Sequence, residues 1–144
     1  MTLLAEEMPE ILLSDIDKER LEALILQSRK GPARNFLEDE LDRAEVIPHH
    51  LLPKDVVVMN SRAEFLDLET GERRALTLVY PGEADLKAGK VSVLAPMGIA
   101  LLGLSAGQRI SWRMPDGRVR RFKIISVAQQ ARPSRPLGRS PPGP

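Results

Sequence analysis

The sequence predicts an α+β protein in which a short antiparallel helical hairpin precedes an antiparallel sheet domain with one short helix. Between residues 14 and 47, apolar residues recur every three or four positions, as they do along one face of a helix. From residue 55 onward they alternate with polar residues or form short β-branched runs, as in strands. The 144 residues, 42% of them apolar, suit one globular domain with a small appendage.

These patterns divide the chain into five segments. They are a lead-in over residues 1–13, the helical hairpin over 14–47, a linker over 48–54, the sheet domain over 55–130, and a tail over 131–144. Pro48 and Pro53 mark the linker because proline obstructs continuation of a helix. The tail has five prolines, three arginines and little to bury, so we expect it to be disordered.

The first helix is predicted to begin after Ser14, because Ser14 and Asp17 are residue types that accept hydrogen bonds from the free amides at a helix start. Its apolar stripe follows at helical spacing. The stripe consists of Leu21, Leu24, Ile25 and Ser28.

The second helix is predicted over residues 33–46, after Gly31 ends the first and Pro32 begins the second. Leu37, Leu41 and Ala44 form its apolar stripe. Two such short helices would be marginal alone, so we expect them to pair as an antiparallel hairpin.

Strands are predicted over residues 56–59, 74–80 and 110–114, with hairpin turns at 69–72 and 115–117. Between the second and third of these strands, residues 96–102 are predicted to form a short helix that Pro96 begins and Gly103 ends. The last strand, over 119–127, interleaves basic and apolar residues, which predicts a basic solvent face. The basic residues are Arg118, Arg120, Arg121 and Lys123.

Composition excludes several classes of function. The chain has no cysteine, which removes disulfides and thiolate chemistry and suits a reducing compartment. The N-terminal residues carry Glu6, Glu7 and Glu10 in place of the positive charge of a signal peptide, and no apolar run is long enough to span a membrane. We expect a cytoplasmic protein without membrane contact.

A metal site at His49 and His50 is not expected, although histidine is a common ligand. Adjacent side chains diverge, and there is neither a third histidine nor a cysteine to complete the site. We predict no metal and no cofactor.

Charge is distributed unevenly along the chain. From Arg109 onward there are nine basic residues and one acid, against twelve basic and nineteen acidic residues before it, so the two parts carry +8 and −7. Such a division can orient a protein on a charged partner, and it equally suits an ordinary solvated surface with a basic tail. It does not identify the partner.

Several motifs in order resemble the C-terminal domain of the GreA/GreB transcript-cleavage factors, and most of all their small relatives, the regulators of nucleoside diphosphate kinase. The motifs are VVMNS at 57–61, LVYP at 78–81, SVLAPMGIALLGL at 92–104 and PDG at 115–117. The resemblance covers residues 14–127 and is architectural only in the hairpin. It implies the fold of the FK506-binding prolyl isomerases for the sheet domain, and bacterial RNA polymerase as the partner.

The resemblance also implies where the chain would dock. In the family, the start of the short helix and its preceding loop belong to the surface that meets the rim of the polymerase secondary channel. The matching residues here are Val93, Leu94, Ala95, Pro96 and Met97. Leu94 stands where cleavage factors commonly have an acid. Pro96 as the simple start of a core helix is the competing interpretation.

The hairpin tip carries the mechanism in cleavage factors, where two acidic residues help to hold a magnesium ion in the polymerase active centre. Here the tip over residues 28–35 reads SRKGPARN, with three cations, Arg29, Lys30 and Arg34, and no carboxylate. About 13 residues per helix give a reach of only ~20 Å. We therefore expect a regulator without cleavage activity.

We expect this protein to be a monomeric, non-enzymatic regulator that competes with Gre-type factors at the secondary channel. One alternative is a nucleic-acid-binding protein that uses the basic last strand and tail. A less favoured alternative is a prolyl isomerase, since a shared fold does not establish function.

Overall fold

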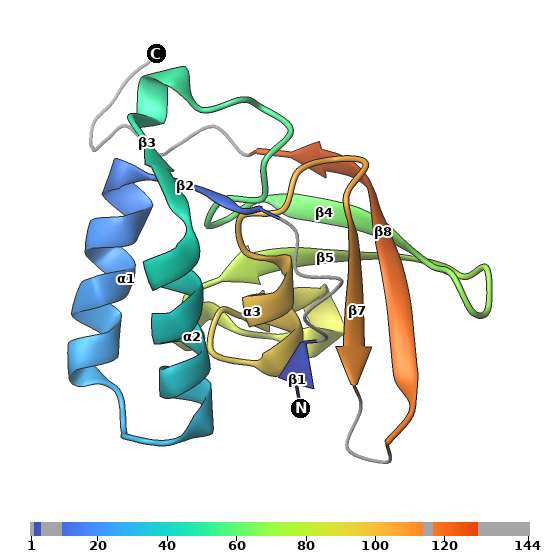
Figure 1. Cartoon of the computed structure of the whole chain (residues 1–144), viewed down its shortest axis with the longest axis horizontal. Coiled ribbons are helices and arrows are strands. Elements are labelled where there is room, and N and C mark those ends of the chain that lie inside the picture. Colours follow the sequence, from blue (N-terminus) through green and yellow to red (C-terminus); the bar gives the residue numbers. More distant parts are fainter. Residues whose placement is uncertain (1, 4–9, 114–116, 130–144) are drawn as a thin grey trace.

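The computed structural model describes residues 2–3, 10–113 and 117–129 and confirms the α+β class (Figure 1). A hairpin of two helices lies beside a six-stranded sheet, and a two-stranded sheet stands at the base of the hairpin. In chain order the elements are β1 (Thr2–Leu3), β2 (Leu12–Ser14), α1 (Asp15–Gln27), α2 (Pro32–Arg43), β3 (Glu45–Ile47), the 3-10 helix η2 (His49–Leu51), β4 (Arg62–Asp67), β5 (Arg73–Val79), the 3-10 helices η3 (Pro81–Glu83) and η4 (Leu86–Ala88), β6 (Lys90–Ser92), α3 (Pro96–Leu101), β7 (Arg109–Arg113) and β8 (Val119–Ala128).

The large sheet has the strand order β1-β7-β8-β4-β5-β6. Its pairs are antiparallel, as predicted, except that β5 and β6 run parallel. The exception arises because β5 and β6 are joined by a crossover through η3 and η4, whereas a tight turn would have made the pair antiparallel. The predicted turn at 69–72 joins β4 to β5, and the one predicted at 115–117 lies mostly outside the described residues.

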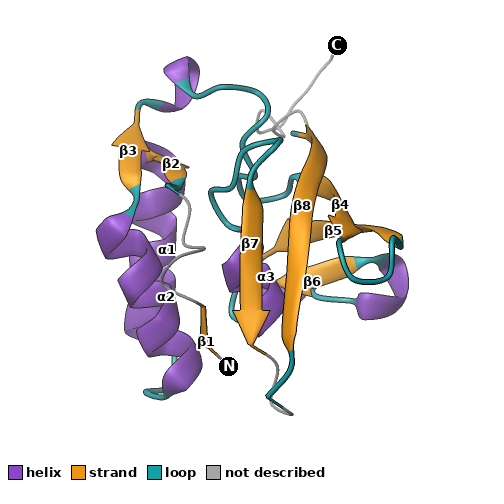
Figure 2. Ribbon diagram, turned by 45° about the vertical axis from the view of Figure 1, so that its right-hand side comes forward, coloured by secondary structure: helices purple, strands orange, loops and turns teal. Residues whose placement is uncertain are grey.

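The predicted cap of the first helix is confirmed, because the Ser14 hydroxyl accepts a hydrogen bond from the Asp17 amide at 2.9 Å. Leu21 and Ile25 of α1 and Leu37 and Leu41 of α2 are buried, as the apolar stripes predicted. Figure 2 shows the two helices side by side, with α3 between them and the sheet. The hairpin therefore packs against the sheet domain through α3.

The second helix ends at Arg43, so the prediction that it extends to Val46 is wrong. Its last residues belong instead to β3, which pairs in parallel with β2. The Glu45 amide donates to the Ile11 carbonyl at 3.0 Å, and the pairing continues to the residue before Pro48. The β-branched Val46 and Ile47 suit this strand, and the residue before a proline is disfavoured in a helix.

Residues 56–59 are buried but do not form the predicted strand. Val56 makes one isolated bridge to Ser105, and the Val57 amide donates to the Leu104 carbonyl at 2.8 Å. The Gly103 amide donates to the Val57 carbonyl at 2.9 Å. The first half of the segment therefore pairs with the loop that follows α3, whereas the Val58 amide donates to the Ser61 hydroxyl at 3.0 Å and the Met59 amide donates to the side chain of Asp17. The apolar run reflects burial.

Ile11 and Leu12, just before α1, pack closely on the same loop. The Leu12 amide donates to the Gly103 carbonyl at 3.0 Å, and a Cβ atom at Gly103 would lie 2.7 Å from the Cβ atom of Ile11. Gly103 also has φ = +81°, a conformation that favours glycine. In the described part of the chain, the structure has no helix with the length and apolar character required to cross a membrane.

Candidate docking surface

The loop from β6 into α3 is held by short hydrogen bonds within itself and to the sheet. The Ser92 hydroxyl accepts from the Leu94 amide at 3.0 Å, and the Ser92 carbonyl accepts from the Ala95 amide at 3.0 Å. The Val93 amide donates to the Val79 carbonyl of β5 at 2.9 Å. Pro96 occupies the first turn of α3, where a missing amide proton has no cost.

The five residues predicted to dock differ in exposure. Val93 is fully buried in the core, so it supports the loop and offers no surface. Pro96 is exposed, and Leu94, Ala95 and Met97 are partly buried and pack against the core. The structure therefore brings four of the five to the surface around the start of α3.

Gly98 fixes how closely α3 approaches this loop. A Cβ atom at Gly98 would lie 1.9 Å from the Ser92 carbonyl oxygen and 2.8 Å from its carbonyl carbon, both of them backbone atoms. Only glycine permits this approach. Gly98 thereby sets the position of Pro96 and Met97 relative to the sheet.

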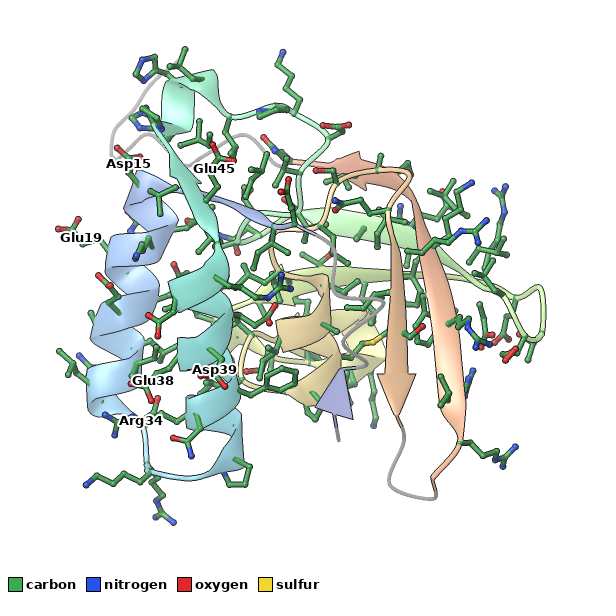
Figure 3. All side chains as sticks on the ribbon, viewed as in Figure 1. Asp15, Glu19, Arg34, Glu38, Asp39 and Glu45 are labelled. Atoms are coloured by element: carbon green, nitrogen blue, oxygen red, sulfur yellow. The ribbon has the colours of Figure 1, made fainter. Side chains whose placement is uncertain are left out.

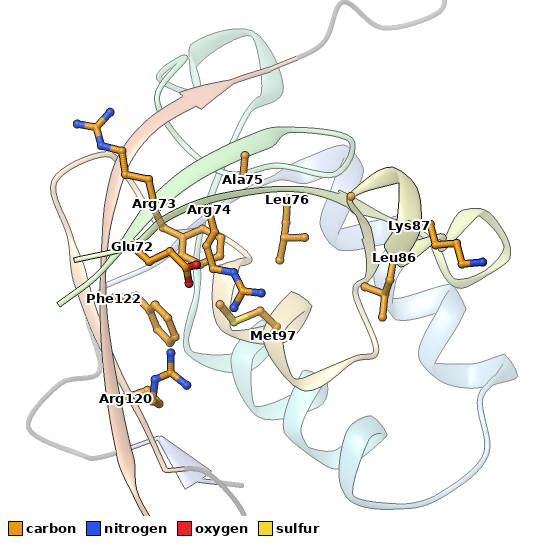
Figure 4. A pocket seen from close by; sticks show the side chains of 12 residues that line it. Glu72, Arg73, Arg74, Ala75, Leu76, Leu86, Lys87, Met97, Arg120 and Phe122 are labelled. Carbon is orange, nitrogen blue, oxygen red and sulfur yellow. The ribbon is translucent and has the colours of Figure 1, made fainter. Parts of the chain in front are cut away.

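Met97 lines an open hollow of about 680 Å³ between α3, the sheet and η4, which we name the α3 hollow (Figure 4). Its lining residues come from β4, β5 and the turn before it, η4 and the residue after it, α3 and β8. They are Phe65, Glu72, Arg73, Arg74, Ala75, Leu76, Leu86, Lys87, Gly89, Met97, Arg120 and Phe122.

Apolar side chains form much of the α3 hollow. The rings of Phe65 and Phe122 meet edge to face, with centroids 5.5 Å apart, and Leu76 and Met97 are partly buried beside them. Leu86 is 74% exposed. Figure 4 shows Leu86 across the hollow from Phe122, with Met97 between them. An exposed leucine in a concave surface is a feature of binding sites for apolar groups.

The rim of the α3 hollow is cationic. Arg73, Arg74 and Lys87 are exposed, and the one acid in the lining is Glu72. Arg73 makes a long ion pair of 3.6 Å with Glu64. Within the described residues, no ion pair is recorded for Arg74 or Lys87. The hollow therefore suits a partner that presents apolar side chains flanked by carboxylates.

Arg120 at the end of the α3 hollow belongs to an internal ion pair. Its guanidinium group donates a hydrogen bond to the buried carboxylate of Asp67 and lies 5.7 Å from the ring centroid of Phe122. Asp67 also accepts from the amides of Glu69 and Thr70, at 2.8 and 3.2 Å. The Asp67 carboxylate therefore holds the backbone of the β4–β5 turn in place.

Burial by itself would raise the pKa of Asp67, but the hydrogen bond from Arg120 and those from the Glu69 and Thr70 amides outweigh it. The pKa of Asp67 consequently lies below its ordinary value. The same contact with Asp67 raises the pKa of Arg120. Both groups are charged across the physiological pH range, and the ion pair supports the end of the α3 hollow structurally.

The predicted basic solvent face of the last strand is corrected in one respect. Arg120 shares the inner face of β8 with Phe122 and is paired with Asp67 there, so it does not belong to the solvent face. Arg121 is exposed but lies 3.8 Å from Glu69. The strand thus presents less uncompensated charge than its sequence indicated.

The hairpin tip contains one cation with a structural contact. Arg34 donates from Nη1 to the Ser28 carbonyl at 3.2 Å, and Ser28 is the residue that ends α1. Arg29 and Lys30 are exposed. Figure 3 shows Glu38 and Asp39 along α2, set back from the tip where Arg34 lies.

Of the two adjacent histidines, His49 contacts the base of the hairpin. The His49 amide donates to the Asp15 carboxylate at 3.0 Å, and His49 Nδ1 lies 3.5 Å from the same oxygen. Slight burial by itself would raise the pKa of Asp15. The hydrogen bonds from His49 and from the Ile16 amide outweigh this effect, so the pKa of Asp15 is lowered. No group of three or more potential metal-binding side chains occurs in the part of the chain that the structure describes.

Sequence reasoning missed the residues of β5 and η4 that line the α3 hollow. The β5 residues lie about twenty positions before the predicted docking loop, and η4 lies in the crossover just before β6, so both meet the loop through the sheet register and the crossover. A signal was present in Leu86, the one large apolar residue within the run EADLKAGK. Arg73 and Arg74 directly before the alternating part of β5 were a second signal.

Comparisons with known proteins give the family. The family model "Transcription elongation factor, GreA/GreB, C-term" matches residues 52–129, and the model "Rnk N-terminus" matches residues 9–47. The regulator of nucleoside diphosphate kinase of Escherichia coli (strain K12) is 40% identical over 124 residues, which is 85% of this chain and 91% of that protein.

Transcription elongation factor GreA of Nitratidesulfovibrio vulgaris is 38% identical over 65% of this chain and 58% of its own length. A solved structure, a prokaryotic transcription elongation factor GreA/GreB from Nitrosomonas europaea, has 45% identity and a TM-score of 0.69 over 84% of this chain and 99% of that one. The chain therefore belongs to the GreA/GreB C-terminal-domain family, within the branch of the regulators of nucleoside diphosphate kinase.

Proposed function

We propose that this protein is a non-enzymatic transcription regulator that binds bacterial RNA polymerase at the rim of its secondary channel. It would dock through residues 94–97 and the α3 hollow and compete there with Gre-type factors. The observation that carries the proposal is the α3 hollow itself, which opens beside the predicted docking loop in a chain of the GreA/GreB family.

The chemistry of the α3 hollow specifies what the polymerase rim would present. Leu76, Leu86 and Met97 offer apolar area, and burying it on binding contributes about 25 cal/mol per Å² before the costs of association. Arg74 and Lys87 at the rim would pair with carboxylates and increase the rate of encounter. The partner segment is therefore an apolar projection with acidic neighbours.

The short hairpin supports the proposal that the protein does not stimulate transcript cleavage. The tip over residues 28–35 contains no carboxylate that could hold a magnesium ion. The helices α1 and α2 have 13 and 12 residues, which corresponds to ~20 Å of length. Occupying the channel entrance is thus the action that this hairpin can support.

Neither alternative function is favoured by the structure. Asp67 and Glu69 compensate part of the charge that a nucleic-acid surface on β8 would use. Five of the twelve residues that line the α3 hollow are charged, which does not suit an apolar isomerase pocket. Prolyl isomerase turnover at the uncatalysed rate would remove that alternative directly.

Two exposed leucines provide a matched test of the docking surface. Leu86 lies in η4 at the α3 hollow and is 74% exposed, whereas Leu51 lies in η2, outside the hollow, and is 65% exposed. We expect Leu86→Asp to weaken binding to core RNA polymerase by about tenfold or more, equivalent to ~1.4 kcal/mol. Leu51→Asp should bind as the unchanged protein does.

The charges of the rim are tested in the same assay. Arg74→Glu/Lys87→Glu should weaken binding and reduce its dependence on salt, because the pair faces acidic groups of the partner. Arg20→Glu/Lys54→Glu, which reverses two exposed cations outside the α3 hollow, is the control for net charge. If Leu86→Asp and the rim variant bound polymerase as tightly as their controls, docking through the α3 hollow would be rejected.

A further inference from the structure

A second concave surface lies between the two helices of the hairpin, away from the docking surface. This groove has a volume of about 350 Å³. Its lining comes equally from α1 and α2, and we name it the hairpin groove. The lining residues are Glu22, Ile25, Leu26, Glu38, Leu41 and Asp42.

The hairpin groove combines an apolar floor with an acidic rim. Ile25 and Leu41 are buried, whereas Leu26 is 79% exposed, which leaves apolar area uncovered. The other three lining residues, Glu22, Glu38 and Asp42, are all acids. Among the described residues, none of these three carboxylates has a recorded ion pair. A cationic segment with an apolar side chain is the ligand that this surface fits.

We propose that the hairpin groove binds the chain's own C-terminal segment, residues 131–144. This segment reads ARPSRPLGRSPPGP and carries three arginines, no acid and one leucine, Leu137. Three cations and one large apolar side chain match three carboxylates and an apolar floor. Its five prolines restrict the backbone, so less conformational entropy is lost when it is held.

The fold places Gln129, the last described residue before this segment, on the linker that leads out of the hairpin. The Gln129 side chain donates to the carbonyls of Pro53 and Val56, at 3.0 and 2.9 Å. Shortly before Pro53, His49 contacts Asp15, the first residue of α1. Figure 1 accordingly shows the end of β8 and the start of α1 at the same end of the molecule.

The extended length of the segment exceeds the depth of the groove along α1. Glu22 lies seven residues into α1, or about 10 Å along the helix. The ten residues from Gln129 to Arg139 can span up to about 33 Å, at ~3.3 Å per residue. Tethering also gives an effective concentration in the millimolar range, so a weak surface is sufficient. Binding would bring the basic end of the chain onto its acidic part and neutralise part of the charge division.

Paramagnetic broadening in the full-length protein tests this proposal. The chain contains no cysteine, so Ser140→Cys provides a unique position for a nitroxide label. We expect amide signals of residues 22–26 and 38–42 to lose more than half of their intensity in low salt. They should recover in 1 M salt, where the Debye length is about 3 Å.

Neutralising the rim should separate the proposed contact from nonspecific attraction. Glu22→Gln/Glu38→Gln/Asp42→Asn is expected to abolish the broadening. The control Glu19→Gln/Asp39→Asn/Glu45→Gln, which removes three exposed carboxylates outside the groove, should preserve it. Figure 3 shows Glu38 between the helices and Glu19 pointing away on the far side of α1.

Three outcomes would overturn the proposal. One is no broadening at residues 22–26 and 38–42. Another is broadening that survives in the triple variant. The third is equal broadening when the nitroxide and the ¹⁵N label are on different molecules, which would assign the contact to a second copy.

Discussion

The buried carboxylate of Asp17 in α1 accepts a hydrogen bond from the backbone amide of Met59 at 3.0 Å. The two residues are 42 positions apart, and the bond joins the hairpin to the irregular segment that enters the sheet domain. Asp17 and Ser14 together mark the start of α1. The amide of Asp17 serves the cap, while its side chain joins two parts of the fold.

Loss of the Asp17 carboxylate should destabilise the whole protein. Asp17→Ala leaves the buried Met59 amide without this acceptor, and an unsatisfied buried donor costs about 1–3 kcal/mol. The free energy of unfolding in urea should fall by that amount. Glu19→Ala, an exposed change two residues along the same helix, is the control and should alter it by less than ~0.5 kcal/mol. Equal stability of the two variants would contradict a role for the Asp17–Met59 bond.

A methyl group at Gly98 should disturb the docking surface. Gly98→Ala places Cβ against the Ser92 carbonyl, so α3 must move or the loop must deform, at a cost of about 1–3 kcal/mol. We expect lower stability in urea and weaker binding to polymerase. Gly82→Ala has nothing within 4 Å of the new atom and should change neither quantity. An unchanged Gly98→Ala protein would show that the close approach is not required.

The ion pair of Asp67 with Arg120 should make stability depend on acid pH. Because the pKa of Asp67 is lower in the folded protein than its ordinary value of 3.8, the charged pair stabilises the fold above that value. The contribution is lost as the pH falls from about 3.8 through the lower folded pKa. Asp67→Asn removes the charge.

Urea unfolding at a series of pH values measures this effect. The unchanged protein should be more stable than Asp67→Asn by a constant amount near neutral pH, and the difference should shrink below about pH 4. Asp39→Asn, which changes an exposed acid, should show no comparable difference. A difference between Asp67→Asn and the unchanged protein that persisted undiminished at pH 2 to 3 would rule out the charge as its cause.

The three cations at the hairpin tip should differ in their contribution to stability. Arg34→Ala removes a hydrogen bond to the end of α1 and should lower the free energy of unfolding by about 0.5–1.5 kcal/mol. Arg29→Ala/Lys30→Ala changes two exposed side chains and should leave stability within ~0.5 kcal/mol. Thermal unfolding of both variants checks this. A greater loss in the double variant would contradict the assignment.

Local features of the fold were predictable from the sequence. The Ser14 cap, the stripes with Leu21 and Leu37, and the short helix at Pro96 depend on residues within a few positions of one another. β3 was missed because its partner, β2, is more than thirty residues away along the chain. The run at 56–59 looked like a strand because burial and β pairing leave the same apolar signature.

The candidate site was predictable only in part, for the same reason. The family resemblance located Pro96 and Met97, but not the burial of Val93 or the α3 hollow beside them. The hollow requires the register of β4, β5 and β8 together with the crossover that carries Leu86. Arg120 looked like a solvent cation because its partner, Asp67, lies 53 positions earlier.

The most direct test of the account combines binding and cleavage in one experiment. The purified protein is added to stalled elongation complexes of bacterial RNA polymerase, with and without a cleavage-competent Gre factor, and bound protein and cleaved transcript are measured in the same samples. We predict that it binds, displaces the Gre factor, suppresses cleavage in proportion to occupancy, and causes no cleavage alone. Absence of binding at physiological salt, or cleavage by this protein alone, would contradict the account.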